Sequence, residues 1–302
     1  MPAALTVKVP ATVANLGPGF DALGVAVQLH LQIDIEPRRD SIDVSLEGEG
    51  SDGLPTDESN LVIRSMNSFF DHVGRRPPGF AVRIRNPIPL ASGLGSSAAA
   101  VVGGLVAARG LTGSQVPQTE MIELATTMEG HPDNVMAALL GGLVVCYRDE
   151  SELRHMRLEP SDRLVPVVIV PREGYPTSKA RKGLPGDVSF ADAQFTASRA
   201  ALLVGGIVTG AGADVLRDAM SDRLHEPHRL RLMPETAAVH SELRAAGLPV
   251  ALAGAGPSLL VIAPRPEVAT RAEQIRRICR AREAGWKVFV SEWESQGATA
   301  TP

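Results

Sequence analysis

The sequence predicts an α+β protein built from two domains. The chain has 302 residues, a length that suggests about two hydrophobic cores. Apolar residues make up 44% and charged residues 21% of it, which is typical of a globular protein. Alternating and helix-spaced apolar residues are interspersed in both halves. A charged stretch with little apolar periodicity occupies residues 148–163, so we place the domains at residues 1–155 and 156–302.

The first half contains both kinds of apolar pattern. Period-two alternation predicts strands at residues 5–9, 22–35, 41–46, 80–85 and 143–147. Helical spacing predicts helices at residues 61–73, 96–110, 117–128 and 135–140. Between these elements, residues 10–21 are expected to form a turn-rich segment, because Gly17, Pro18 and Gly19 mark a loop. Residues 47–57 are expected to form a polar loop.

The second half predicts a strand, helices, paired strands, a helix and a last strand. Its strands are expected at residues 164–170, 250–253, 259–263 and 287–290. Its helices are expected at residues 191–204, 213–219, 234–246 and 267–282. This order is close to that of a ferredoxin-like fold. We expect polar connections at residues 171–185 and 221–229, and a frayed tail after Glu294.

Composition excludes several classes of partner. The net charge is −4 and no basic run stands out, so we expect no nucleic-acid partner. No secretory leader pattern is visible, and the longest apolar runs are too short to span a bilayer, so we expect no membrane association. Cys146 and Cys279 lie in apolar settings, which suits a reducing compartment, and a cytoplasmic location is expected.

A loop of glycine and serine residues precedes the alanine-rich helix that begins near residue 96. Gly93 and Gly95 allow the backbone to turn tightly and to approach a ligand closely. Ser96 or Ser97 is expected to cap the helix, whose free N–H groups and positive dipole end attract an anion, most naturally phosphate. The serine hydroxyls could also bind a hard cation such as Mg²⁺.

Other interpretations of this loop remain open. It is not a Walker A loop, because no Gly-Lys-Ser/Thr follows. Residues 93–98 fit the dinucleotide fingerprint in its Gly/Ala form, so a nicotinamide-dependent oxidoreductase is an alternative. That fit is incomplete because Pro87 and Pro89 separate the loop from the preceding strand. The simplest alternative is a helix start with small residues for close packing.

Polar residues near residue 130 could complete a phosphoryl-transfer site. Ser97 and Glu129 could hold a divalent cation, since Mg²⁺ usually keeps few protein ligands; simple surface exposure of Glu129 is the alternative. His131, Asp133 and Asn134 lie in one turn, without a second His or Cys at zinc-ligand spacing. Asp133 or Asn134 could instead cap the next helix.

Two basic loops occupy the second half of the chain. Arg181 lies in one and Arg229 in the other, and each could pair with a substrate carboxylate or lie on a solvated surface. Residues 254–258 form a second glycine loop, which could also be a tight hairpin connection.

These motifs together resemble one family. Residues 89–99 are similar to the ATP-binding signature of the GHMP small-molecule kinases, which act on galactose, homoserine, mevalonate and phosphomevalonate. Within that family the chain resembles the branch that phosphorylates L-homoserine. The matching segments follow in family order at residues 14–21, 129–134, 177–181, 226–229 and 254–258.

The resemblance implies a two-domain GHMP kinase fold, with an N-terminal half like the second domain of ribosomal protein S5 and a ferredoxin-like C-terminal half. It implies transfer of the γ-phosphate of ATP to the hydroxyl of L-homoserine, a step of threonine biosynthesis. It also implies Mg²⁺ bound by Ser97 and Glu129, and a possible homodimer. A non-catalytic ligand sensor on the same scaffold is a further alternative. The presence of the metal ligands Ser97 and Glu129 argues against it, because a sensor could lose them.

The resemblance also implies site residues. For ATP they are Pro89, Leu90, Ala91, Ser92, Gly93, Leu94, Gly95, Ser96, Ser97, Ala98 and Ala99, with Asn60, Leu61, Val62 and Asn86 near the adenine. For the amino acid they are Asn15, Asp21, His131, Asn134, Thr177, Arg181 and Arg229. The catalytic residues would be Asp21, Asn134, Ser97 and Glu129.

Elementary chemistry agrees with that assignment. Arg181 and Arg229 suit the carboxylate of a zwitterionic amino acid, and Asp21 suits its ammonium group. Asn134 or Asp21 could instead hold the reacting hydroxyl. No group is obviously tuned to abstract a proton, so we expect catalysis mainly by positioning and charge neutralisation. Asp133 is the residual candidate for a general base.

Overall fold

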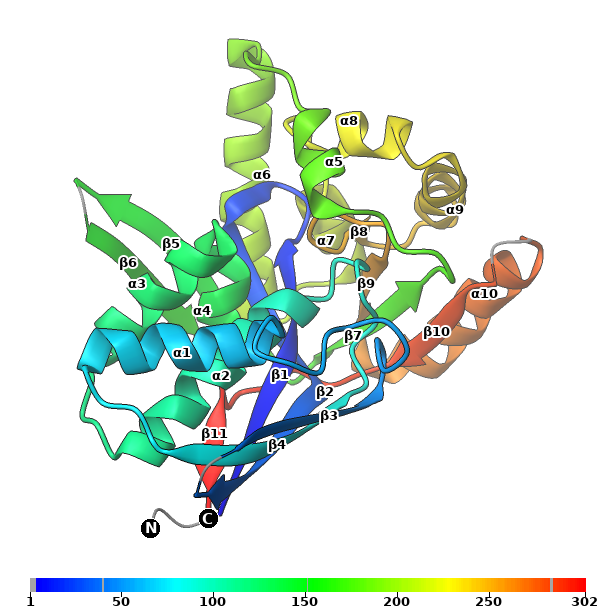
Figure 1. Ribbon diagram of the computed structural model, residues 1–302. Coiled ribbons are helices and arrows are strands. Elements are labelled where there is room, and N and C mark those ends of the chain that lie inside the picture. Colours follow the sequence, from blue (N-terminus) through cyan, green and yellow to red (C-terminus); the bar gives the residue numbers. More distant parts are fainter. Residues whose placement is uncertain (1–3, 40, 151, 283–284) are drawn as a thin grey trace.

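The strands of the protein form two sheets in the computed structural model, which describes residues 4–39, 41–150, 152–282 and 285–302 (Figure 1). The first sheet has seven strands, in the order β11-β1-β2-β4-β3, with β5 paired to β2 and β6 paired to β5. They are β1 (Leu5–Asn15), β2 (Gly19–Arg38), β3 (Ile42–Gly48), β4 (Gly79–Asn86), β5 (Leu143–Asp149), β6 (Glu152–Leu158) and β11 (Thr299–Thr301). The helices beside it are α1 (Leu61–Val73), α2 (Ser96–Thr112), α3 (Gln118–Glu129) and α4 (Pro132–Leu140).

The second sheet has four strands, in the order β10-β7-β9-β8. They are β7 (Leu164–Val170), β8 (Val250–Leu252), β9 (Leu259–Pro264) and β10 (Lys287–Val290). The helices of this half are α5 (Thr177–Lys182), α6 (Phe190–Thr209), α7 (Ala213–Ala219), α8 (Glu226–Arg231), α9 (Pro234–Ala245) and α10 (Val268–Arg280), with a 3₁₀ turn at Arg265–Glu267. The α+β class and the two-part organisation are therefore confirmed.

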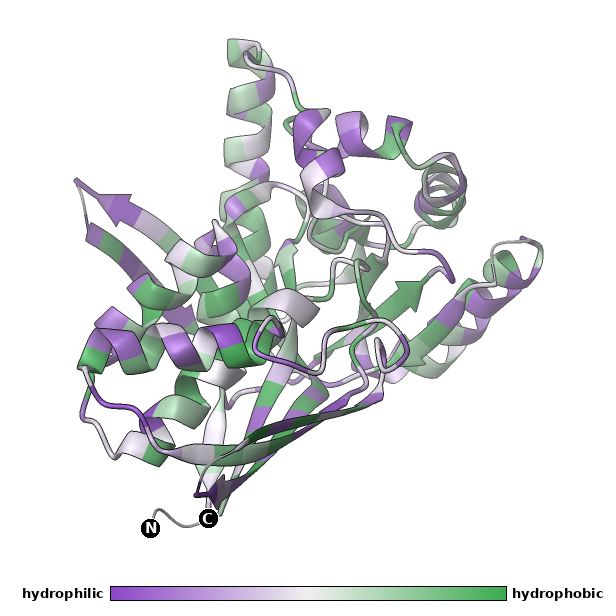
Figure 2. Cartoon of the chain, viewed as in Figure 1, coloured by the Kyte–Doolittle hydropathy of each residue, from purple (hydrophilic) through white to green (hydrophobic). Residues whose placement is uncertain are grey.

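Strand β7 is buried on both faces and joins the two cores. Its side chains alternate, so that Leu164 and Val168 belong to the large core, which also holds side chains of α2, α6 and α7, while Val167 and Ile169 pack with side chains of α9 and α10. A strand that is buried on both faces needs a continuous apolar sequence, and β7 is coloured as hydrophobic along most of its length (Figure 2). The two halves therefore both pack against the same strand, β7.

The first hairpin differs from its expected form. Residues 10–15 are not a turn but continue β1, and β2 is one strand of 20 residues. Ala11 and Val13 are fully buried on this strand, and a register shift after Pro10 accommodates the proline. The turn is confined to a few residues around Gly17. The hairpin thereby carries Asn15 and Asp21 into the cleft.

The charged stretch at residues 148–163 contains a strand that was not predicted. β6 pairs with β5 in an antiparallel hairpin, and the side chains of β6 itself are exposed or half-buried, which explains its lack of apolar periodicity. The predicted domain division after residue 155 falls inside β6 and not in a linker. The domain limits stay a prediction. The connections at residues 171–185 and 221–229 likewise contain the short helices α5 and α8.

The expectation of a frayed tail after Glu294 is wrong. β11 pairs with β1, and the N–H group of Ala298 donates to the carbonyl of Ala138 on α4. Backbone hydrogen bonds, rather than apolar side chains, hold this segment, so hydropathy gives little sign of it. None of the helices within the described ranges is both long enough and apolar enough to cross a bilayer.

Candidate active site

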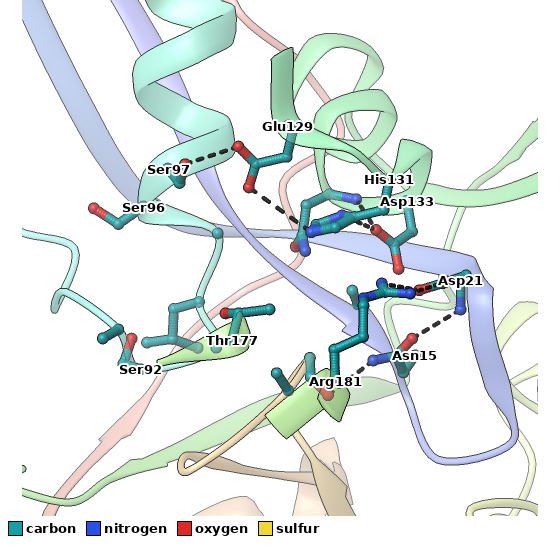
Figure 3. A pocket seen from close by; sticks show the side chains of 18 of the residues that line it. Asn15, Asp21, Ser92, Ser96, Ser97, Glu129, His131, Asp133, Thr177 and Arg181 are labelled. Atoms are coloured by element: carbon teal, nitrogen blue, oxygen red, sulfur yellow. Dashed lines mark hydrogen bonds and ion pairs between the residues drawn. The ribbon is translucent and has the colours of Figure 1, made fainter. Parts of the chain in front are cut away.

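One cavity gathers most of the predicted site residues from both halves of the chain (Figure 3). It lies between the loop before α2, the turn between α3 and α4, the β1–β2 turn, α5, α8 and the loop after β8. The predicted residues that line it are Asn15, Asp21, Pro89, Ala91, Ser92, Gly93, Leu94, Gly95, Ser96, Ser97, Glu129, His131, Asn134, Thr177, Arg181 and Arg229. Asp133, Ala14, Gly254 and Ala255 complete the lining.

The glycine loop has two positions, Gly93 and Gly95, that a residue with a Cβ atom could not occupy without a collision. Gly93 has φ +85°, and a Cβ there would lie 2.0 Å from the carbonyl oxygen of Ala253. Gly95 has φ +69°, and a Cβ there would lie 2.1 Å from Oγ1 of Thr12. Both the dihedral angle and the close packing therefore require glycine. At Gly93 the glycine loop of the first half therefore packs closely against the loop after β8 in the second half.

The predicted serine cap of α2 is wrong. Gly95 is the N-cap residue and makes no side-chain cap bond, so Ser96 and Ser97 are the first two helical residues. The helix begins at residue 96 as predicted, and it is the left-handed Gly95 that takes the N-cap position. Backbone N–H groups of the first turn therefore keep no carbonyl partner within the helix, as an anion site requires. The hydroxyls are left for other partners, and Ser97 donates to Glu129.

Glu129 and Ser97 form the pair expected to hold a cation. Oγ of Ser97 donates to Oε2 of Glu129 across 2.7 Å, and the Glu129 side chain is only 11% exposed. Burial raises the pKa of Glu129 although the Ser97 hydrogen bond lowers it. A cation beside the carboxylate would offset that cost of burial. Ser97 and Glu129 offer oxygen ligands, so the pair fits a hard cation such as Mg²⁺ that keeps most of its own water. No group of three His, Cys, Asp or Glu side chains suited to a metal occurs among the described residues.

The start of α4 places the side chains of His131 and Asp133 side by side (Figure 3). Nδ1 of His131 donates to Oδ1 of Asp133 across 2.9 Å, and the same oxygen accepts the backbone N–H of Asn134. Burial opposes charge on His131, but the hydrogen bond from its ring to Asp133 and the neighbouring carboxylates outweigh burial and raise its pKa. His131 is the N-cap of α4 and makes no side-chain cap bond, and Asp133 and Asn134 lie in the first turn, so the alternative that one of them caps this helix is wrong. Asp133 anchors the His131 ring instead.

Thr12 is a site residue that the sequence did not reveal. It is fully buried on β1, and its hydroxyl donates to Oδ1 of Asn134 across 2.8 Å. Its backbone N–H donates to the carbonyl of Leu94 in the glycine loop. A threonine within an apolar strand gives no chemical signal, so only the fold shows that it orients the Asn134 amide.

The β1–β2 turn holds Asp21 in an unusual conformation. Asn15, Leu16 and Asp21 all have positive φ values, which are rare for residues other than glycine. Oδ1 of Asn15 accepts the backbone N–H of Asp21, and its Nδ2 donates to the carbonyl of Gly254. Asp21 then accepts two hydrogen bonds of 2.9 Å from Arg181. Local strain at this turn is a common mark of a functional site.

Arg229 is a buried cation at the inner wall of the cavity. Its residue is 1% exposed, and its Nη1 donates to the carbonyl of Gly254 and to Nδ1 of His225, each across 3.1 Å. Its buried Nε has no hydrogen-bond partner. Burial lowers the pKa of Arg229, and no carboxylate of the described residues lies within salt-bridge distance of it. An anionic group entering the cavity would meet a charge that the protein leaves largely uncompensated.

The predicted adenine residues do not line this cavity. Asn60 is the N-cap of α1, where its Oδ1 accepts the N–H of Val62, and Val62 is buried in the core. Asn86 lines a second cavity together with Pro87 and residues 48–53 of the polar loop. Nδ2 of Asn86 also donates to Oγ of Ser96, so this second cavity adjoins the start of α2. Leu90, Ala98 and Ala99 lie outside the lining of the first cavity.

Comparison with known proteins places the sequence in a family. The sequence matches the family model for the GHMP kinases N terminal domain at residues 60–142 and that for the GHMP kinases C terminal at residues 207–281. It is 40% identical to homoserine kinase of Streptomyces avermitilis over 303 residues, covering 99% of this chain and 96% of that protein. It is 43% identical to homoserine kinase of Moorella thermoacetica over 255 residues, covering 84% and 86% of the two chains.

The structure agrees as well. The crystal structure of homoserine kinase from Cytophaga hutchinsonii superposes with a TM-score of 0.87 at 28% identity, covering 100% of this chain and 98% of that one. The glycine loop lies within the matched GHMP kinases N terminal domain, and the predicted resemblance to this family is confirmed. This chain belongs to the GHMP kinase family and, within it, to the homoserine kinases.

Proposed function

We propose that this chain transfers the γ-phosphoryl group of ATP to the side-chain hydroxyl of L-homoserine, giving O-phospho-L-homoserine and ADP. The observation that carries the proposal is identity of about 40% to homoserine kinases over almost the whole chain. The reaction is a step of threonine biosynthesis. The cavity supports it because it combines a phosphate-type loop with the opposite charges that a zwitterionic amino acid needs.

The glycine loop would hold the triphosphate. Its free N–H groups and the positive end of α2 would face a bound anion, and Gly93 and Gly95 would let the backbone approach it closely. Ser97 and Glu129 would hold Mg²⁺, which neutralises charge on the phosphates when bound. The cavity beside Asn86 adjoins the start of α2, so it offers space for the nucleoside.

The amino acid would lie between Asp21 and Arg229. Asp21 would accept hydrogen bonds from the ammonium group, and Arg229 together with Arg181 would bind the carboxylate. The side chain would then extend toward Asn134 and the glycine loop. There its hydroxyl oxygen would form a bond to the γ-phosphorus while the bond from that phosphorus to the leaving oxygen of ADP breaks, and the hydroxyl proton would pass to a phosphate oxygen or to water. Catalysis by this arrangement rests on alignment and on charge neutralisation.

Replacing Arg229 by methionine tests the carboxylate assignment. We expect the KM for homoserine to rise roughly tenfold or more and the KM for ATP to change little, because only the amino acid loses a charged partner. Arg231→Met is the matched control, since Arg231 lies exposed on the same helix. Steady-state kinetics with a coupled ADP-release assay measure both constants. Equal rises in the two constants would contradict the assignment.

Replacing Asp133 by asparagine separates positioning from base catalysis. Asparagine keeps an oxygen that can accept from His131 and from the N–H of Asn134, so the turn before α4 should survive. We expect kcat to fall by less than about a hundredfold, which is the smallest loss expected for a true general base. A larger fall at unchanged KM values would make Asp133 the base.

The acceptor itself is tested by assaying ADP release with several alcohols. We expect turnover with homoserine. With mevalonate, shikimate or sugars we expect far slower turnover or none. Turnover of a sugar without turnover of homoserine would leave the kinase family intact but overturn the proposed substrate.

A further inference from the structure

His225 contacts Arg229 but does not itself line the cavity. It is 1% exposed, and one of its ring nitrogens contacts a hydrogen-bond donor while the other contacts an acceptor. Nδ1 accepts a hydrogen bond from Nη1 of Arg229 across 3.1 Å, and Nε2 donates to the carbonyl of Gly17 across 2.7 Å. The ring also lies against Phe20, with the ring centroids 5.2 Å apart. His225 thus links the buried arginine to the β1–β2 turn.

The chemistry of these partners fixes the state of the ring. A carbonyl oxygen only accepts, so Nε2 must carry a proton, and a guanidinium only donates, so Nδ1 must lack one. His225 is therefore the neutral tautomer with its proton on Nε2. Burial lowers its pKa to about 4, although the nearby Asp222 carboxylate raises it. The adjacent cation of Arg229 further disfavours a charged ring.

The start of α8 holds the ring in place. Oδ2 of Asp222 accepts the backbone N–H groups of His225 and Glu226, each across 2.8 Å, and its Oδ1 accepts that of Leu224. Oε1 of Glu226 in turn accepts the N–H of Leu252 at the end of β8. These contacts tie α8 to the second sheet, so His225 has a rigid base from which to act.

Both contacts of the guanidinium engage Nη1. The carbonyl of Gly254 accepts from it and so does His225, which leaves Nε and Nη2 for another partner. These two nitrogens form the edge of the guanidinium that can bind a carboxylate through two parallel hydrogen bonds. A second hydrogen bond on Nη1 fixes the rotation of that edge, which the Gly254 carbonyl alone would leave free.

We propose that His225 is a positioning residue, which holds the guanidinium of Arg229 so that its Nε–Nη2 edge meets the carboxylate of the amino-acid substrate. The inference rests on the proposed function, because it assumes that Arg229 binds this carboxylate. It assigns the orientation of that arginine to a neutral histidine that never touches the substrate.

Two substitutions separate the two ring contacts. Glutamine at 225 can place its amide nitrogen near Nε2 and keep the bond to Gly17, but it loses the acceptor at Nδ1. Asparagine can place its oxygen near Nδ1 and keep the acceptor for Arg229, but it loses the bond to Gly17. We expect His225→Gln to raise the KM for homoserine roughly tenfold while the KM for ATP changes less than about twofold. We expect His225→Asn to raise the KM for homoserine much less. His228→Gln, on the same helix, is the matched control.

Arg229→Met distinguishes failure of this inference from failure of the proposed function. If that variant leaves the KM for homoserine unchanged, the carboxylate assignment itself is wrong. If it raises this KM but the two His225 variants have equal effects, His225 only supports the fold and the inference is wrong. In an Arg229→Met background, His225→Gln should add no further rise in KM, since the residue that it positions is gone.

A measurement on the unaltered protein covers the case in which the variants fail to fold. Nitrogen-15 NMR of the histidine rings reports which nitrogen carries the proton. We expect His225 to keep its proton on Nε2 alone from about pH 6 to about pH 8, a range in which an ordinary histidine titrates. A proton on Nδ1 at either pH would overturn the proposal.

Discussion

Glu129→Gln is expected to lower kcat by roughly 100- to 1,000-fold, the loss typical of removing one electrostatic group that acts on the transferring phosphoryl group. Glutamine keeps the size of the side chain and an oxygen that can accept from Ser97, so the fold should be unaffected. What is lost is the charge that would help to hold Mg²⁺. The apparent Mg²⁺ affinity should therefore fall together with kcat, and excess Mg²⁺ should restore part of the activity.

The matched control for this substitution is Glu123→Gln, because Glu123 is exposed on the same helix, α3. It should leave kcat and the Mg²⁺ dependence unchanged. Steady-state rates measured over a range of Mg²⁺ concentrations distinguish the two variants. Activity of Glu129→Gln close to that of Glu123→Gln would remove Glu129 from the proposed cation site.

Gly93→Ala is expected to abolish nucleotide binding. The new Cβ would lie 2.0 Å from the carbonyl oxygen of Ala253, a backbone atom that cannot move without displacing the loop after β8. The glycine loop must shift instead, and its N–H groups then lose their common direction toward the phosphates. The backbone strain of alanine at φ +85° adds about 1 kcal/mol of destabilisation.

Gly74→Ala separates these two effects. Gly74 has φ +64° at the end of α1, and no atom lies within 4 Å of the Cβ that alanine would add. It shares the backbone strain but not the collision, so it should cost about 1 kcal/mol of stability and leave ATP binding intact. Nucleotide titration by calorimetry and thermal unfolding measure the two quantities. Normal ATP affinity in Gly93→Ala would mean that the triphosphate binds elsewhere.

The sequence predicts this site well because its chemistry is concentrated in short segments. Gly93 to Ser97, Glu129 to Asn134 and Arg181 carry functional side chains in contiguous motifs, and the fold brings them into one cavity. Thr12 acts on Asn134 from an apolar strand, 122 positions away along the chain. His225 acts on Arg229 only four residues further on, but its other ring nitrogen contacts Gly17, 208 positions away. Local patterns mark neither role, because each depends on a contact between distant parts of the chain.

The fold was predictable where apolar periodicity decides the structure. β7 and α1 have clear patterns and form as expected. β6 and β11 do not, because backbone hydrogen bonds to a neighbouring strand stabilise them while their side chains are largely exposed. The predicted serine cap was wrong for a different reason, since the left-handed Gly95 occupies the N-cap position and neither serine hydroxyl is used to cap the helix.

The central claim is that the N–H groups before α2 bind the triphosphate of ATP next to a cation held by Ser97 and Glu129. A crystal structure with Mg²⁺, homoserine and a non-hydrolysable ATP analogue tests it most directly. We expect the triphosphate to lie over residues 93–97, with the metal ion in contact with Ser97 and Glu129. A triphosphate bound anywhere else in the molecule would contradict the account.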